Sequence, residues 1–209
     1  MSHTPTIHSS GQMGELRKLI EQRLEPGADK QRIDELIWER FGDEWTVMFT
    51  DLVGFSRRVA EFGIIHFLQV ILESERLFSD SIYRHNGIVL KTEGDSMLLV
   101  FREAQDAVTC AIEMQRVAAS YNDGVEEAEK VLLCVGIGCG KVLYIGQEDV
   151  FGAEVNAAAK LGEDTAVAWE ILVTDALAQK IKTMTDIGLE PIEQVPHGVD
   201  AAYRLLYQL

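Results

Sequence analysis

The sequence is poor in the features that mark secreted and membrane proteins. Its 209 residues include only three cysteines, Cys110, Cys134 and Cys139, which form no C-x-x-C pair and leave an odd count. This usage suits buried thiols in a reducing compartment better than a disulfide framework. No apolar run approaches the roughly 20 residues that cross a bilayer, and the N-terminus MSHTPTIHSSGQ lacks the basic and apolar regions of a secretion signal. We therefore expect a cytoplasmic protein with no membrane partner.

Positive charge is also scarce. The chain has 19 lysines and arginines against 34 aspartates and glutamates, a formal net charge of -15. Such a surface repels phosphate backbones, so we expect no nucleic-acid partner bound through its charge. An anionic substrate would have to be met by local cations or bound metal ions. With 47% apolar residues and only 4 prolines, the chain can bury a core of its own.

The first part of the chain separates into a tail and a helical extension. Residues 1–11 are polar and irregular, and we expect a disordered tail there. In residues 12–43, apolar residues recur twice at helical spacing, which predicts two short amphipathic helices. Their apolar stripe favours packing on the main domain or contact with a second subunit. The stub of a longer regulatory region is the alternative.

From residue 44 to 209 the pattern predicts one domain that begins with a strand. The segment 45–51, WTVMFTD, is rich in aromatic and β-branched residues and ends in an acid. A turn and one long helix, from Ser56 to about His85, are expected next. The apolar segments 87–92 and 96–101 then flank a short polar link, which is typical of a β-hairpin.

The remainder predicts further strands and helices in alternation. We expect a helix over 103–121, two strands within 130–146 that turn around Gly138 and Gly140, and an alanine-rich helix over 152–162. A strand, a short helix and two edge strands near 186–194 and 200–207 complete the domain. This order resembles an α+β fold with a ferredoxin-like core sheet and flanking helices.

Two acids stand where apolar strands meet turns. Asp51 and Asp95 lie 44 residues apart, and adjacent strands could bring them to one rim of a sheet. Hard cations such as Mg²⁺ prefer carboxylate oxygens, although an acid at a strand end, taken alone, usually caps or solvates a turn. After Asp51, the turn through Gly54, Phe55 and Ser56 would offer backbone N–H groups to a phosphate, or would simply cap a helix.

Three segments together resemble a known family. FTDLVGFS, KTEGDSMLLVF and DVFGAEVNAAAKL are similar, in this order, to the successive motifs of class III adenylate and guanylate cyclases, a resemblance that spans about residues 45–207. It implies that Asp51 and Asp95, with the Leu52 carbonyl, bind two divalent metal ions, Mg²⁺ or Mn²⁺. It further implies that the turn at Phe55 and Ser56 holds the triphosphate, and that the active site forms between the subunits of a homodimer.

The resemblance also assigns recognition of the base to Lys91 and Asp149. A lysine donates to adenine N1 and an aspartate accepts from the adenine N6 amino group, whereas guanine presents a donor to the lysine and an acceptor to the aspartate. Mismatched buried polar groups cost about 1 to 3 kcal/mol each, so the pair predicts ATP over GTP. Outside this motif context, a surface lysine and a loop acid would be the ordinary interpretation.

Two positions depart from the family pattern. Asn156 matches the family's ribose-orienting asparagine, but Lys160 replaces the arginine that contacts the phosphates in the transition state, and so lacks its bidentate fork. His197 with Gly198 replaces a Lys-Gly pair that reaches the triphosphate, and a neutral histidine is a weaker phosphate ligand. Asn156 and Lys160 are four residues apart and would share one helix face.

We therefore expect an adenylate cyclase that converts ATP to 3′,5′-cyclic AMP and pyrophosphate by two-metal-ion catalysis at a homodimer interface. Two alternatives stay open: a catalytically weak nucleotide-binding regulatory module of the same fold, and a cyclase for GTP or a pyrimidine nucleotide. A diguanylate cyclase is disfavoured because the hairpin link, Glu93-Gly94-Asp95-Ser96, lacks a GGDEF-like signature.

Overall fold

A computed structural model describes residues 11–193 and 195–209 of the chain, with the backbone alone at residues 55–58. The predicted tail over 1–11 therefore lies outside the described residues except for Gly11. The Phe55 and Ser56 side chains lie outside them too, whereas the backbone N–H groups predicted to bind phosphate are described.

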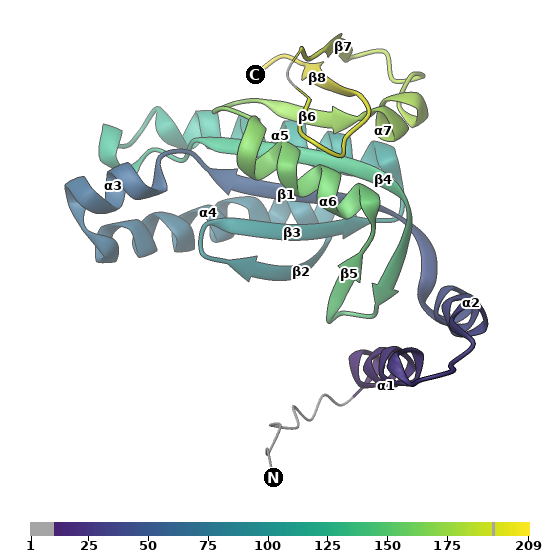
Figure 1. Ribbon diagram of the computed structural model, residues 1–209. Coiled ribbons are helices and arrows are strands. Elements are labelled where there is room, and N and C mark those ends of the chain that lie inside the picture. The colour runs from purple at the N-terminus through teal and green to yellow at the C-terminus, as the bar shows by residue number, and fades with distance from the viewer. Residues whose placement is uncertain (1–10, 194) are drawn as a thin grey trace.

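The described residues form one mixed sheet of eight strands (Figure 1). Its order is β2-β3-β1-β4-β6-β8-β7, with β5 paired to β4 beside this path. The neighbours are antiparallel except β4 and β6, which are parallel. The strands are β1 (Gly42–Leu52), β2 (Ile88–Glu93), β3 (Ser96–Phe101), β4 (Leu133–Ile145), β5 (Asp149–Phe151), β6 (Ile171–Thr174), β7 (Gly188–Pro191) and β8 (Ala202–Leu206).

Helices flank the sheet on both faces, which confirms the α+β class. The main hydrophobic core lies between the sheet and α4, α5 and α7, and it includes the fully buried Phe78, Phe101 and Met114. A smaller core on the opposite face lies under α6. The helices are α1 (Gln12–Leu24), α2 (Lys30–Phe41), α3 (Phe55–Phe62), α4 (Ile64–Arg84), α5 (Ala104–Asn122), α6 (Ala153–Ala159) and α7 (Asp175–Lys180), with a 3-10 turn at Glu127–Glu129 and a π-helical turn at Lys160–Thr165.

Two predicted elements differ from the structure because of glycines. The single helix expected over 56–85 is two helices, α3 and α4, because Gly63 between them has a φ of 86°, a left-handed conformation that a helix interior does not allow. The two strands expected within 130–146 are one, β4. A Cβ at Gly138 would lie 2.7 Å from the Glu154 carbonyl oxygen, so this glycine serves close packing of α6 on the strand, and the strand continues through it without a turn.

Two edge strands were expected near 186–194 and 200–207. Only β7 lies at the edge of the sheet, because β8 lies between β6 and β7. The two N-terminal helices form as predicted and pack on the end of β4, where Leu16, Ile37 and Phe41 surround Ile145 (Figure 1). Among the described residues, none of the helices combines the length and apolar character needed to span a bilayer.

Candidate active site

The strand register places one row of side chains across the face of the sheet that carries α6. Lys91 on β2 pairs with Leu98 on β3, Leu98 pairs with Phe49 on β1, and Phe49 pairs with Gly136 on β4. Directly paired residues point to the same face of a sheet. Lys91 therefore extends over the apolar surface of Leu98 and Phe49, and we call this row the base row.

A second row, the acid row, runs parallel to the first. Glu93 pairs with Ser96, and Ser96 Oγ donates to Asp51 Oδ1 at 3.1 Å. Asp51 follows Phe49 by two residues and therefore shares its face, which puts the rows about 7 Å apart along the strands. Asp95 precedes Ser96 in the β2–β3 turn, where Gly94 adopts a φ of 62°. The β2–β3 turn and the pairing of β3 with β1 thus bring both predicted metal ligands to one rim of the sheet.

Asp51 and Asp95 are half-buried carboxyl groups, and both have raised pKa values. Burial, together with the nearby Asp95 charge, raises the pKa of Asp51 to about 6, although hydrogen bonds from Ser96 and the Leu52 backbone oppose this shift. Burial raises the pKa of Asp95 as well, while a hydrogen bond with Asp51 opposes it. Burial disfavours the charged form of both carboxylates, and a divalent cation bound between them would relieve this cost.

Few other protein ligands are available beside this pair. In the ranges that the structure describes, no group of three or more His, Cys, Asp or Glu side chains is arranged to hold a metal ion. A cation at Asp51 and Asp95 would therefore complete its shell with backbone, water and substrate oxygens, as Mg²⁺ commonly does. The role predicted for the Leu52 carbonyl stays a prediction.

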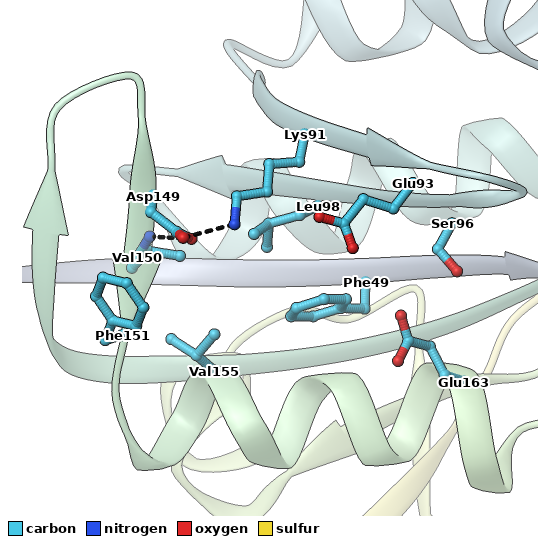
Figure 2. Close-up of a pocket in the computed structure, with 10 residues that line it drawn as sticks. All are labelled: Phe49, Lys91, Glu93, Ser96, Leu98, Asp149, Val150, Phe151, Val155 and Glu163. Carbon is cyan, nitrogen blue, oxygen red and sulfur yellow. Dashed lines mark hydrogen bonds and ion pairs between the residues drawn. The ribbon is translucent and has the colours of Figure 1, made fainter. Parts of the chain in front are cut away.

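A cavity of about 190 Å³ opens over the base row (Figure 2). At one end the Lys91 Nζ lies 2.5 Å from Asp149 Oδ2, and the Val150 backbone N–H donates to the other Asp149 oxygen at 2.8 Å. The lysine and the aspartate come from β2 and β5, which are 58 residues apart in sequence. The apolar part of the lining is contributed by Phe49, Leu98, Val150, Phe151 and Val155.

The cavity therefore combines apolar walls with one donor and one acceptor at a single end. Such a slot suits a flat heteroaromatic ring that has an acceptor and a donor side by side on one edge. Lys91 and Asp149 were both singled out from the sequence, and the structure brings them into direct contact. Their ion pair occupies the place where such an edge would bind.

Glu163 is a lining residue that the sequence interpretation missed. It projects from the π-helical turn toward Ser96 at the other end of the cavity (Figure 2). Burial of its carboxyl group raises the pKa of Glu163, and a hydrogen bond from Ser96 opposes this. No sequence signal marked it, because the predicted alanine-rich helix ended at Gly162, whereas the π-helical turn continues through Glu163 to Thr165.

The helix α6 carries the two remaining predicted side chains. Asn156 is exposed on α6, and Lys160 begins the π-helical turn one helical turn later. The Lys160 Nζ donates to the His197 backbone carbonyl at 2.5 Å. The lysine predicted to stand in place of the family's arginine therefore contacts the segment predicted to stand in place of its Lys-Gly pair. The His197 side chain itself is exposed.

Known proteins share the sequence pattern and the fold of this domain. The family described as "Adenylate and Guanylate cyclase catalytic domain" matches residues 39–196. "Putative adenylate cyclase 3" of Rhizobium meliloti is 28% identical over 141 residues, which cover 68% of this chain and 24% of that protein. The chain spans between 16% and 34% of the length of the first curated relatives that it matches.

Solved structures share the fold at low identity. The adenylyl cyclase CyaB from P. aeruginosa aligns with a TM-score of 0.66 at 21% identity, over 80% of this chain and 96% of that one. The monomeric guanylyl cyclase domain of the RhoGC fusion protein from Blastocladiella emersonii aligns with a TM-score of 0.68 at 18% identity, over 80% and 96%. Similarity of this degree establishes the fold and leaves the nucleotide open.

Proposed function

The chain belongs to the adenylate and guanylate cyclase catalytic domain family, and from this premise we propose that it is an adenylate cyclase that converts ATP to 3′,5′-cyclic AMP and pyrophosphate. The observation that carries the choice of ATP is the contact between Lys91 and Asp149 at the end of the apolar cavity. A curated relative named a putative adenylate cyclase is consistent with this choice.

Base selection follows from the two polar groups. If the adenine ring enters between the apolar walls, its N1 accepts from the Lys91 ammonium group and its N6 amino group donates to the Asp149 carboxylate. These bonds replace the present ion pair, so both groups remain partnered. Guanine would set its N1–H against the ammonium group and O6 against the carboxylate, which costs about 1 to 3 kcal/mol for each mismatch.

Asp51 and Asp95 would hold the divalent ions at the acid row. Bound there, two such ions would supply Lewis-acid activation of the ribose 3′-hydroxyl and charge neutralisation of the triphosphate. Ser96 keeps one Asp51 oxygen oriented through its 3.1 Å hydrogen bond. The backbone N–H groups at the start of α3, four residues after Asp51, would bind phosphate oxygens.

Asn156 and Lys160 would act from α6 on the ribose and the phosphates. Their spacing of one helical turn lets both contact one substrate. Lys160 brings a single point charge, so it stabilises developing charge on the phosphates less specifically than an arginine fork. Its present partner, the His197 carbonyl, would have to share or release it.

We further propose that the active enzyme is a homodimer with composite sites. The acid row of one subunit would then act on a nucleotide whose base lies in the partner subunit's cavity. Phe151, which lines the cavity on this face, is 41% exposed in the single chain. Burial of such side chains against a second copy would stabilise the dimer.

The decisive experiment is mass analysis of the products after incubation with Mn²⁺ and an equimolar mixture of the four nucleoside triphosphates. We expect 3′,5′-cyclic AMP as the main product. A main product of cyclic GMP would refute the assignment of Lys91 and Asp149. The matched control is Lys91→Met, which keeps the length of the side chain but removes the donor, and should lose the preference for ATP.

A second candidate function follows from the bond between Lys160 and His197. If this bond holds in the complex, the phosphates lack their cation and the domain acts as a nucleotide-binding module with negligible turnover. Calorimetric binding of ATP with no cyclic product in the same preparation would favour this module.

A further inference from the structure

The N-terminal helices reach the base cavity through one strand pair. In the β4–β5 ladder, Ile145 lies directly opposite Asp149. Ile145 is fully buried, and the residues that cover it are Leu16 from α1 and Ile37 and Phe41 from α2. The residue that faces the candidate base acceptor is therefore enclosed by the helical extension.

Contacts on both sides of Ile145 tie the same hairpin to the helices. A Cβ at Gly146 would lie 2.8 Å from Gln12 Oε1, so α1 begins directly against the β4–β5 turn. On the other side, the Lys141 ammonium group lies 4.9 Å from the centre of the Trp38 ring. The extension thus contacts β4 at several points over the stretch that ends in the turn before Asp149.

The strand that carries Asp149 is short. β5 has three residues, and within the described ranges it pairs with β4 alone, while Val150 at its centre is buried in the core under α6. Beyond this one anchor, a strand of this length is held by the strand and turn to which it is bonded. The position of Asp149 against Lys91 therefore depends on how firmly β4 and the turn are held.

We propose that α1 and α2 act as a positioning element that fixes Asp149 opposite Lys91 and so sets the selection of the base. The effect of these helices on base selection depends on the function proposed above, whereas their effect on the position of Asp149 does not. The family match begins at residue 39, so α1 and most of α2 lie outside the matched domain. Disturbance of these helices should change recognition of the base and leave the acid row intact.

The test uses the full chain with the double substitution Leu16→Ala and Ile37→Ala. Both side chains are nearly buried, at 8% and 4% exposure, and their truncation opens a cavity under Ile145. The control is Ile20→Ala with Leu24→Ala, because these side chains on α1 are 42% and 75% exposed. Ile37→Val serves as the conservative variant that should retain the behaviour of the parent.

Two measurements separate positioning from general stability. Hydrogen exchange of the amides from Ile145 to Phe151 should become about tenfold faster in the double variant, with little change in β1 and β3. The ratio of the ATP and GTP dissociation constants, measured with Ca²⁺ to limit turnover, should fall by about tenfold toward equality. Mn²⁺ affinity, measured separately, should equal that of the parent.

The outcomes distinguish this inference from the proposed function. If α2 amides exchange freely while β5 stays protected and the nucleotide ratio is unchanged, the positioning role is wrong. Equal acceleration in β1 and β3 would also overturn it, since the helices would then support the whole sheet. If the parent binds no nucleotide, the proposed function fails and the exchange of β5 alone decides the positioning role.

Discussion

The two faces of the sheet differ in what they bury. The face under α4, α5 and α7 holds a continuous apolar core, whereas the face under α6 holds a smaller core beside the base and acid rows. β1 contributes to both faces. Met48 is fully buried in the main core, while Phe49 and Asp51, which point to the opposite face, belong to the rows. The alternation of a strand thus lets one segment stabilise the fold and carry the candidate site.

From this difference we predict that the charged carboxylates of the acid row are needed for turnover but do not stabilise the fold. The substitution Asp51→Asn should reduce cyclic product formation by about a thousandfold or more, because the proposed metal ligand loses its charge. The thermal unfolding temperature should not fall, because burial already disfavours the charged carboxylate, as its raised pKa of about 6 indicates. Mass analysis of product and calorimetry of the same samples measure both effects.

Asp43→Asn is the matched control for this change. Asp43 lies on the same strand, where it pairs with Arg102 at a solvent-accessible position. An isolated surface pair of this kind contributes little, so both turnover and stability should stay close to those of the parent. Unchanged turnover in Asp51→Asn would contradict the metal assignment.

On the face under α4, α5 and α7, we expect substitutions to reduce stability. Phe78→Ala should lower the free energy of unfolding by about 3 to 5 kcal/mol, because the ring is fully buried between α4 and the sheet. Leu68→Ala on the same helix is the control, since Leu68 is 52% exposed and its truncation should change stability by less than about 0.5 kcal/mol. Urea unfolding measures both, and equal losses in the two variants would show that the face is not organised as described.

The sequence predicted most of the fold because its elements are marked locally. The hairpin over 87–101 and the helix over 103–121 have regular apolar periods and clear ends, and both formed as expected. The elements that differed were those in which a glycine has two interpretations. Gly63 separates two helices, while Gly138 permits α6 to approach the sheet, and only tertiary contacts decide between these roles.

The sequence predicted most residues of the candidate site but not how they are arranged. The motifs singled out Lys91 and Asp149, but their direct contact depends on β5 folding back along β4. Glu163 went unnoticed because it lies just beyond the predicted helix, in a π-helical turn that the sequence did not indicate. The link between Ile145 and the N-terminal helices was equally invisible, since it joins segments more than a hundred residues apart.

Lys160 offers a smaller test of the face that carries the rows. Lys160→Arg should raise turnover of ATP by about fivefold, because an arginine fork can keep a bond to the His197 carbonyl and still present N–H groups to a phosphate. Lys160→Gln is the control, and its turnover should fall below that of the parent. Steady-state kinetics measures both, and a slower arginine variant would indicate that Lys160 mainly supports the loop around His197.

The smallest effect concerns the pH dependence of stability in the metal-free protein. Because the pKa of Asp51 is about 6 in the fold and near its ordinary value of 3.8 in the unfolded chain, the folded state binds the proton more tightly. The stabilisation from this protonation is complete below about pH 4 and is lost as the pH rises through 6. The advantage in stability of Asp51→Asn over the parent should therefore grow between pH 4 and 7 in urea titrations with a chelator.

Saturating Mn²⁺ should reverse that advantage at pH 7, since only the parent would gain binding energy at the acid row. A pH-independent difference would mean that the Asp51 carboxylate is already fully solvated, and the contrast between the two faces would then lose its electrostatic part.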